Sequence, residues 1–388
     1  MERGLQGKLR VCGPVAEPYR AFVPNPLLPM PSLRLDGPLV ELLGEADRAI
    51  GRLDGISALL PDRSLFLYFS VRKEALLSSQ IEGTQSSLSD LLLYENDEAP
   101  DSPIEDVEEV SCYVAAVQHG LSLLRDGLPL SARLLREVHG VLLRSGRGSD
   151  KTPDEFRRTQ NWVGGTRPGT ALFVPPPPGE VLELMGALEL FLHNRPTGLP
   201  VLACAGMAHL QFGTIHPFLD GNGRLGRMLV TLHLCAMGVL EDPLLYLSLH
   251  LKQHRDDYYA LLQAVRGSGD WEAWVAFFLE AVVETCNRSC DTARRVHALL
   301  IRDRGRVEQE GRNAGSARRL LDLMTRRPIL TLGRAAKMLG VSFPTASAAA
   351  NRLREAGLLE ETTGRARGRR FVYREYLNLL SEGTEPLR

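Results

Sequence analysis

A run of thirteen residues, from Ile215 to Arg227, places the tightest limits on how this chain can fold. It reads Ile-His-Pro-Phe-Leu-Asp-Gly-Asn-Gly-Arg-Leu-Gly-Arg, and an apolar segment, Met228 to Cys235, follows it. Because Pro217 has no backbone N–H and resists continuation of a helix, we expect residues 216–221 to form a loop. Glycines on both sides of Asn222 permit a tight turn, and a helix is predicted to begin near this asparagine.

The turn and the helix start together form a candidate site for an anion. The N–H groups of Gly221, Asn222 and Gly223 can point inward, next to the positive dipole end of the predicted helix. Arg224 and Arg227 lie three residues apart, so they share a helix face and can both reach one polyanion. A Gly-Asn-Gly turn alone is common in ordinary loops, and only the whole run is specific. The chain has neither a Walker A loop nor a kinase signature, so phosphate binding depends on this turn.

Two further side chains add chemistry to this run. Asp220 is a hard oxygen ligand suited to Mg²⁺, and His216 is a base that titrates near neutrality. The run resembles the signature of the Fic (Fic/Doc) family, His-Pro-Phe-x-Asp/Glu-Gly-Asn-Gly-Arg-x-x-Arg, with every defining position filled. The resemblance implies a mainly α fold, a Fic-type helical bundle with a small β-hairpin flap. It also implies that the segment from Asp220 to Arg227, including Leu225 and Gly226, binds the nucleotide.

The same resemblance implies a reaction, the transfer of AMP from ATP to a Ser, Thr or Tyr hydroxyl of a protein target. His216 would be the catalytic base, Asp220 the Mg²⁺ ligand, Arg224 the partner of the β-phosphate and Arg227 that of the γ-phosphate. Candidate partners are therefore ATP, a target protein and a second copy of this chain, as a target or in a homodimer. Removal of AMP, transfer of another phosphate-containing group, and a DNA-binding regulator whose body senses a nucleotide stay open as alternatives.

A second motif, Ser78-Ser79-Gln80-Ile81-Glu82-Gly83, ends a helix predicted over residues 65–81. Ser78 and Glu82 are four residues apart and share a face, and Gly83 is a natural C-cap. A glutamate in the last turn meets the negative end of the helix dipole, at a cost of about 0.3–1 kcal/mol unless a cation meets it. A solvated glutamate is the alternative. The motif is similar to the inhibitory motif of Fic proteins, which implies that Glu82 pairs with Arg227 and obstructs the γ-phosphate of ATP.

Elsewhere the periodicity predicts helices joined by short loops. Residues 1–38 are rich in proline and are predicted to form an extended arm. Acidic residues between 95 and 109 favour a solvated face. Helices are predicted over 39–53, 107–124, 132–143, 179–193, 199–215, 258–265 and 272–303.

Two short β-prone runs, residues 160–165 and 170–174, are predicted to pair as a hairpin that ends at the prolines of 175–178. A structural hairpin is one interpretation. The family resemblance implies instead a flap whose edge residues, Thr170, Ala171, Leu172 and Phe173, hold the target segment by main-chain pairing. The resemblance also implies that Tyr258 and Tyr259 border the base and ribose of the nucleotide, although aromatic pairs usually pack in the core.

The last part of the chain differs in charge from the rest. Residues 315–388 hold 14 of the 46 Lys and Arg residues but only 7 of the 47 Asp and Glu residues. Predicted helices over 317–324, 332–339 and 343–356, then strands over 358–362 and 371–373 around the Arg-rich segment 364–370, resemble a winged helix-turn-helix domain. Such a domain implies DNA as a partner, and protein contacts or dimerisation are the alternative. Its recognition helix would present Ser342, Thr345, Ser347, Asn351 and Arg352.

These resemblances divide the chain into four parts. We expect an N-terminal arm and inhibitory-helix region at 1–110, a Fic catalytic core at 111–303, a linker at 304–315 and the winged helix-turn-helix domain at 316–388. The six cysteines are scattered and form no zinc pattern, so free thiols are expected. No run approaches 18 apolar residues and no signal-like segment begins the chain, so we expect a cytoplasmic protein without a membrane partner.

Overall fold

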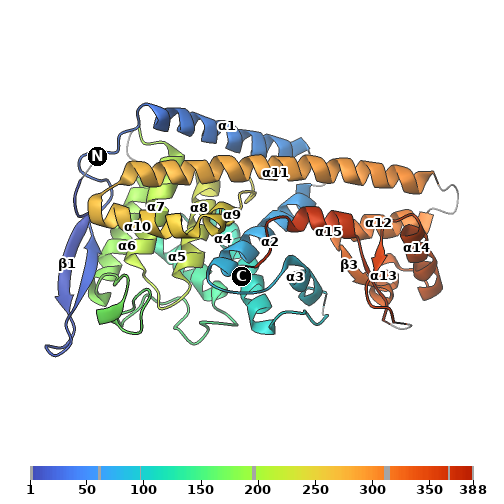
Figure 1. The fold of residues 1–388 in the computed structure, drawn as a ribbon, viewed down its shortest axis with the longest axis horizontal. Helices are drawn as coiled ribbons and strands as arrows, with labels where there is room; N and C mark the ends of the chain where they lie inside the picture. Colours follow the sequence, from blue (N-terminus) through green and yellow to red (C-terminus); the bar gives the residue numbers. More distant parts are fainter. Residues whose placement is uncertain are drawn as a thin grey trace.

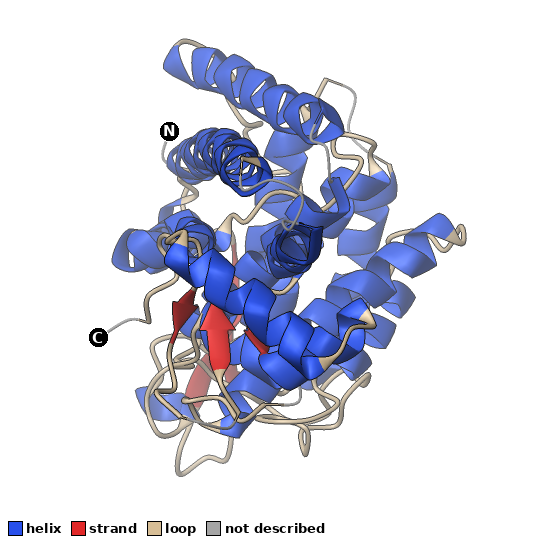
Figure 2. Ribbon diagram, turned by 90° about the vertical axis from the view of Figure 1, so that its right-hand side faces the viewer, coloured by secondary structure: helices blue, strands red, loops and turns tan. Residues whose placement is uncertain are grey.

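The computed structural model describes residues 3–59, 63–96, 98–194, 198–309, 315–365 and 368–386, and it is mainly helical, as predicted (Figures 1 and 2). The central helices are α7 (Val201–Ile215) and α8 (Asn222–Ala236), which pack against each other and are buried along most of their length. Around them lie α1 (Pro38–Leu59), α2 (Arg63–Ile81), α4 (Ile104–Arg125), α5 (Ala132–Leu142), α6 (Val181–His193), α10 (Arg255–Ser268) and α11 (Trp271–Glu308).

Two short helices, α3 (Leu88–Tyr94) and α9 (Ser248–Gln253), were not predicted. They have too few turns to show a helical period, although Ser87 and Asp90 form a capping box at the start of α3. The long α11 lies beside α1 along one face of the molecule (Figure 1). Trp274 of α11 donates a hydrogen bond from its indole nitrogen to the carbonyl oxygen of Gly206 in α7, at 2.8 Å. This contact fixes α11 over the central pair of helices.

The expected extended arm is wrong in part, because residues 7–24 form a β-hairpin. Strand β1 (Gly7–Cys12) pairs antiparallel with β2 (Tyr19–Pro24), and Gly7 lies opposite Pro24. The prolines of this region fall in the turn, at the end of β2 and after it, so they do not remove a donor from the ladder's interior. Arg3 holds the start of the arm to the body through a pair of hydrogen bonds with the carboxylate of Glu272.

The hairpin predicted over 160–174 is also wrong as a β-structure. Within the described residues, only one bridge joins its two halves, between Val163 and Phe173. Gly164 and Gly165 both adopt φ = +70°, and the 3₁₀ helix η1 (Pro168–Thr170) follows. The backbone therefore leaves the extended region directly after the bridge. A second 3₁₀ helix, η2 (Pro178–Glu180), leads into α6.

The C-terminal module begins with α12 (Gly315–Arg326) and adds a small sheet in the order β3-β5-β4. Its other elements are β3 (Ile329–Thr331), α13 (Leu332–Leu339), α14 (Phe343–Glu355), β4 (Glu360–Glu361), β5 (Arg370–Val372) and α15 (Arg374–Ser381). The strand predicted over 358–362 is reduced to β4, β5 is displaced by one residue from the predicted 371–373, and neither β3 nor α15 was predicted. That this module is a winged helix remains a prediction.

The expected linker at 304–315 is wrong at its two ends, which are helical. Helix α11 continues to Glu308, α12 already begins at Gly315, and residues 310–314 lie outside the described residues. Tyr376 of α15 packs edge-on against Phe69 of α2, with ring centroids 5.9 Å apart. The C-terminal module therefore packs against the helical body through the contact of α15 with α2. No helix in the described part of the chain is both long and apolar enough to cross a bilayer.

Candidate functional site

The loop before α8 has the predicted form, and a network of buried groups fixes it. His216 ends α7 in the left-handed region, with φ = 51°. Arg157, which the sequence did not single out, donates from Nε to the carbonyl oxygen of His216 at 2.9 Å, and its backbone N–H donates to Pro217 O at 2.9 Å. Such a conformation costs a non-glycine residue energy, so these two bonds offset local strain at the candidate base.

The imidazole of His216 is suited to accept a proton. Its Nδ1 donates to the carbonyl oxygen of Gly213 at 3.3 Å, which leaves Nε2 as the basic nitrogen. Burial lowers the pKa of His216 to about 4, against a small opposing effect of the Gly213 bond. The ring is therefore neutral at physiological pH, which is the protonation state that a general base needs.

Residues on either side of the loop hold its centre. The side chain of Asn222 accepts from Phe218 N at 2.9 Å and donates to Phe218 O at 2.8 Å, so it closes the turn on itself. His139 of α5 stacks on Phe218, with centroids 3.7 Å apart. Asp154 N donates to His139 Nδ1, so His139 Nε2 carries the proton and donates to Asp220 O at 3.0 Å. His139 and Asp154 are supports that no sequence motif marked.

The turn and the helix start that were predicted as a candidate anion site are both present. Helix α8 begins at Asn222, and Gly221 is its N-cap with φ = 75°. The N–H of Gly221 donates to Asp220 Oδ1 at 2.5 Å, so this carboxylate already satisfies one of the three N–H groups. The side chain of Asp220 is 34% exposed. A partly exposed carboxylate beside a candidate phosphate site has the chemistry to hold Mg²⁺, which is usually bound by one or two carboxylates together with the substrate's phosphates.

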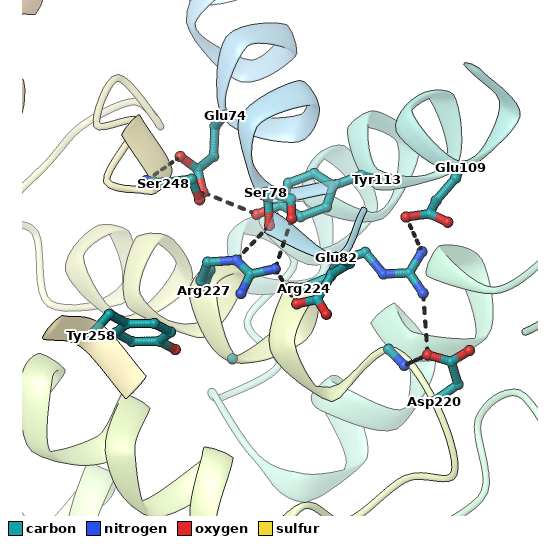
Figure 3. Close-up of polar contacts among 12 residues, drawn as sticks. Glu74, Ser78, Glu82, Glu109, Tyr113, Asp220, Arg224, Arg227, Ser248 and Tyr258 are labelled. Carbon is teal, nitrogen blue, oxygen red and sulfur yellow. Dashed lines mark hydrogen bonds and ion pairs between the residues drawn. The ribbon is translucent and has the colours of Figure 1, made fainter. Parts of the chain in front are cut away.

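The two arginines of the run are buried, and each meets a carboxylate from a distant part of the chain, Glu82 in the turn after α2 or Glu109 in α4 (Figure 3). Arg227 Nη2 lies 2.7 Å from Glu82 Oε1, as the family resemblance implied. Arg227 also donates from Nε to Ser78 Oγ and from Nη2 to Ser78 O, both at 2.8 Å. Arg224 Nη1 lies 3.1 Å from Glu109 Oε1, and its Nη2 lies 3.6 Å from Asp220 Oδ1.

The electrostatics of the Glu82–Arg227 pair favour the charged forms. Burial alone raises the pKa of Glu82, but the charge and hydrogen bond of Arg227 outweigh it, with help from Arg224 and Arg147. The pKa of Glu82 therefore lies below its ordinary value. A Cβ atom added to Gly223 would overlap the carboxylate of Glu82. The glycine at this position is thus what lets Glu82 lie across the start of α8. Gly83, with φ = +105°, reverses the chain directly after it.

A second buried carboxylate, Glu74, lies one turn before Ser78 on α2 (Figure 3). Glu74 accepts hydrogen bonds from the backbone N–H of Ser248 at 3.0 Å and from its hydroxyl at 2.5 Å. The hydroxyl of Tyr113 lies 3.4 Å from it. Burial raises the pKa of Glu74 to about 7, and the bonds from Ser248 only partly oppose this rise. Glu74 therefore joins α2 to α9 at a site that the sequence did not indicate.

Leu225, Gly226, Tyr258 and Tyr259, which were also predicted to bind the nucleotide, differ in how far they are buried. Leu225 is fully buried in the core. The carbonyl oxygen of Gly226 accepts from His209 Nδ1 at 2.7 Å, and His209 Nε2 accepts from the hydroxyl of Tyr258 at 2.9 Å. Tyr258 is thus tied to the back of α8, whereas Tyr259 is 37% exposed.

The expected flap residues are not equally available. Thr170 is exposed and Leu172 is 81% exposed, whereas Ala171 is half-buried. Phe173 is buried, with the guanidinium of Arg266 3.7 Å above its ring. The side of this loop that carries Leu172 is therefore the side that a partner can reach.

The acidic run between residues 95 and 109 is a solvated face only in part: Asp101 and Glu105 are exposed, but three other carboxylates form ion pairs. Glu109 is 2% exposed and pairs with Arg224. Glu95 lies 2.8 Å from Arg72, and Glu98 lies 3.0 Å from Arg370 of the C-terminal module. The run supplies counter-ions to three separate parts of the chain.

Comparisons with known proteins agree with this geometry. A model described as Fic/DOC family N-terminal matches residues 40–122, and one described as Fic/DOC family matches residues 129–234. The protein adenylyltransferase Fic of Aedes aegypti is 39% identical over 133 residues, which are 34% of this chain and 24% of that protein. The protein of the same name from Culex quinquefasciatus is 37% identical over 153 residues, which are 39% of this chain and 27% of that protein. The chain thus spans about a quarter of the length of these curated relatives.

Two solved structures share the fold. A Fic family protein from Desulfovibrio desulfuricans G20 has a TM-score of 0.58 at 22% identity, covering 88% of this chain and 97% of that one. A Fic domain containing signaling protein from Bacteroides thetaiotaomicron VPI-5482 has a TM-score of 0.51 at 19% identity, covering 64% of this chain and 95% of that one. The predicted fold class, a mainly helical Fic fold, is confirmed, with its small hairpin at the N-terminus (β1–β2) and a small C-terminal sheet.

Proposed function

We propose that this chain, which belongs to the Fic/DOC family, transfers AMP from ATP to a hydroxyl side chain of a protein target. The distant relatives named protein adenylyltransferase support the reaction class. The observation that carries the proposal is the convergence on the start of α8 of a neutral imidazole, a glycine-flanked N-terminal turn and two buried guanidinium groups. These are a base and a set of cations placed for a polyphosphate.

In this proposal the hydroxyl oxygen of the target attacks the α-phosphorus of ATP. His216 Nε2 accepts the hydroxyl proton, and general-base help of this kind contributes about 10²–10⁴-fold to a rate. The bond from the α-phosphorus to the bridging oxygen breaks, and pyrophosphate leaves. The N–H groups at the start of α8 stabilise the charge on the α-phosphate, while Arg224 and Arg227 hold the β- and γ-phosphates. Asp220 is the residue that would hold Mg²⁺, which neutralises phosphate charge when bound.

Glu82 would keep this site inactive at rest. Its carboxylate occupies a donor of Arg227 at 2.7 Å, so a γ-phosphate must displace it to reach the same guanidinium. The pair is stable because the pKa of Glu82 is held below its ordinary value and the carboxylate stays charged at neutral pH. Autoinhibition of this kind would be relieved by any change that removes the carboxylate.

The test is labelling with ATP that carries an isotope at the α-phosphate, on the full chain alone and with a cell extract. Glu82→Gly is expected to raise incorporation above that of the unmodified chain, and Glu82→Gly with His216→Ala to abolish it. Gln85→Gly, an exposed position three residues on, controls for a more flexible backbone. Equal incorporation in the unmodified and Glu82→Gly chains would remove the inhibitory role. A signal that survives His216→Ala would remove the catalytic one. Incubating labelled protein with the unmodified chain tests the reverse reaction, AMP removal.

The second candidate is a DNA-binding regulator, favoured by the element order of the C-terminal module. A helix, a strand, two helices and two strands follow one another, and Ser342 caps α14 with its side chain exposed. Thr345, Ser347, Asn351 and Arg352 are half-buried. Within the Arg-rich segment 364–370, whose arginines could contact DNA phosphates, Arg370 pairs with Glu98 at 3.0 Å and Arg367 lies outside the described residues. A DNA footprint that is kept in His216→Ala and lost in Asn351→Ala supports this function.

A further inference from the structure

A second carboxylate lies on the phosphate cradle, and the proposed reaction does not use it. Glu109 of α4 is 2% exposed, and its Oε1 lies 3.1 Å from Arg224 Nη1. Figure 3 shows the guanidinium of Arg224 between Glu109 and Asp220. Arg224 Nη2 is 3.6 Å from Asp220 Oδ1, so one edge of the guanidinium faces α4 and the other faces the cradle.

The energetics of this contact favour a positioning role. Burial raises the pKa of Glu109 above its ordinary value, although the charges of Arg224 and Arg147 oppose that rise. A carboxylate is kept in such surroundings only where a cation meets it. Within the described residues, none of the three guanidinium nitrogens of Arg224 has a partner in hydrogen-bond geometry. Arg224 is therefore held by charge, and its donors remain available to an acceptor in the cradle.

Arg147 connects Glu109 to the turn that carries Glu82. Its Nη1 donates to the carbonyl oxygen of Glu82 at 3.0 Å, and its Nε lies 3.4 Å from Glu109 Oε2. The next residue, Gly148, adopts φ = +86°, and a Cβ atom there would lie 2.7 Å from Asp220 Oδ2. One short loop thus contacts the inhibitory turn, the buried carboxylate and the candidate Mg²⁺ ligand.

We propose that Glu109 is a positioning residue that orients Arg224 toward the β-phosphate, and that Arg147 couples it to the inhibitory turn. This inference rests on the proposed function. It assigns Arg147 two opposite effects on nucleotide affinity, one in the presence of Glu82 and one in its absence. While Glu82 is present, the bond from Arg147 to its carbonyl oxygen strengthens inhibition. Once Glu82 is gone, the remaining effect of Arg147 is to hold Glu109, which favours nucleotide binding.

The test of Glu109 is calorimetric titration with ADP and AMP, in the full chain carrying Glu82→Gly. Because only ADP has a β-phosphate, adding Glu109→Gln is expected to weaken ADP about tenfold and AMP by less than about twofold. Glu109→Asp keeps the charge and should keep most of the preference for ADP. Glu105→Gln, which changes an exposed glutamate one turn earlier on α4, is the matched control.

An unchanged ratio of the ADP and AMP affinities in Glu109→Gln overturns the positioning role, and so does an equal loss for both ligands. If the Glu82→Gly chain binds neither ADP nor ATP, the proposed function fails, and this inference fails with it. Binding of AMP also reports that each variant is folded. A merely structural role for Glu109 would shift the melting temperature but not the ratio of the affinities.

The test of Arg147 is whether its removal changes ATP affinity in opposite directions in the chain with Glu82 and in the Glu82→Gly chain. Arg147→Ala alone is expected to raise ATP affinity, and the same change in the Glu82→Gly chain to lower it. Arg144→Ala is the control, because this arginine is also exposed and lies three residues earlier in the same loop. A change of the same sign in both backgrounds overturns the coupling.

Discussion

Glu82→Gln is the perturbation for which the structure gives the clearest energetic expectation. It keeps the size of the side chain but removes the charge that faces Arg227 at 2.7 Å. Breaking a buried ion pair by removing one partner costs about 3–5 kcal/mol. Here Glu82 is 29% exposed, and Ser78 still accepts two hydrogen bonds from the guanidinium. The expected loss of stability is therefore smaller, about 2–3 kcal/mol.

This loss of free energy of unfolding can be converted into a shift of the melting temperature. An unfolding entropy of about 2.1 cal/mol/K per residue gives about 0.8 kcal/mol/K for a chain of 388 residues. Glu82→Gln should therefore melt about 3 °C below the unmodified chain when no nucleotide is present. ATP brings a new anion to Arg227, and a ligand at 100 times its Kd stabilises by about 2.7 kcal/mol. ATP should therefore raise the melting temperature of Glu82→Gln more than that of the unmodified chain.

The assay is thermal unfolding followed by fluorescence, with and without ATP, and Gln85→Ala is the control. The pH dependence has a definite sign. Because the folded pKa of Glu82 is depressed, its contribution is complete above the unfolded value of about 4.3 and is lost as the pH falls through the folded pKa. The difference between the two chains should be constant from about pH 6 to pH 8 and shrink below about pH 4. Equal melting temperatures at pH 7, with equal shifts on adding ATP, would refute the reasoning.

Three further predictions concern the same site. The first is a pH–rate profile of labelling by the Glu82→Gly chain. Because the pKa of His216 is lowered to about 4, titration of this imidazole should leave the rate unchanged between about pH 6 and pH 8 and lower it toward pH 4. Glu74 has a pKa raised to about 7, so its folded form prefers the proton. Stability should fall as the pH rises from about 4.3 to about 7, and urea midpoints at pH 5 and pH 8 should differ less in Glu74→Gln. Gly223→Ala should displace Glu82 and destabilise by about 2 kcal/mol, and a double-mutant cycle should find it non-additive with Glu82→Gln.

The predictable part of the site depends on local chemistry. Pro217 and Gly221 fix the end of one helix and the start of the next within a few residues, so the loop and the start of α8 follow from the sequence alone. The contact of Glu82 with Arg227 joins positions 145 residues apart, and only the likeness to a family motif indicated it. Helix propensity gives no information about a pairing at that distance.

Glu109 shows why the rest of the site was missed. An acidic run on a helix does not reveal which carboxylate is buried, and the sequence favours solvation for all of them. A signal was nevertheless present, because Tyr113 follows Glu109 by four residues and Ala116 follows it by seven. These two side chains are buried together with Glu109, and the spacing places all three in one buried stripe along α4. A carboxylate that begins such a stripe is a candidate for a buried ion pair.

The other errors have similar physical causes. Proline content hid the N-terminal hairpin, because prolines in turns are compatible with strands on both sides. Residues 160–174 have strand-forming side chains, but Gly164 and Gly165 take the backbone out of the ladder. The expected linker was arginine-rich, yet Arg304 pairs with Asp322 of α12 at 3.0 Å. Because such ion pairs between helices neutralise its arginines, the start of the expected linker can continue α11 as a helix.

The end of α2 limits how Glu82 can move. Gln80, two residues earlier and 1% exposed, donates to Thr384 O at 2.8 Å and to Ser86 O at 3.0 Å, and it accepts from Lys252 Nζ at 2.7 Å. At about 1 kcal/mol each, these bonds oppose a rigid shift of α2. Release of Arg227 should therefore be local, in the Glu82 side chain and the turn after it. On ATP binding, hydrogen exchange should increase in residues 82–84 and stay constant in residues 76–81. Faster exchange throughout residues 76–84 would show instead that the whole helix end unfolds.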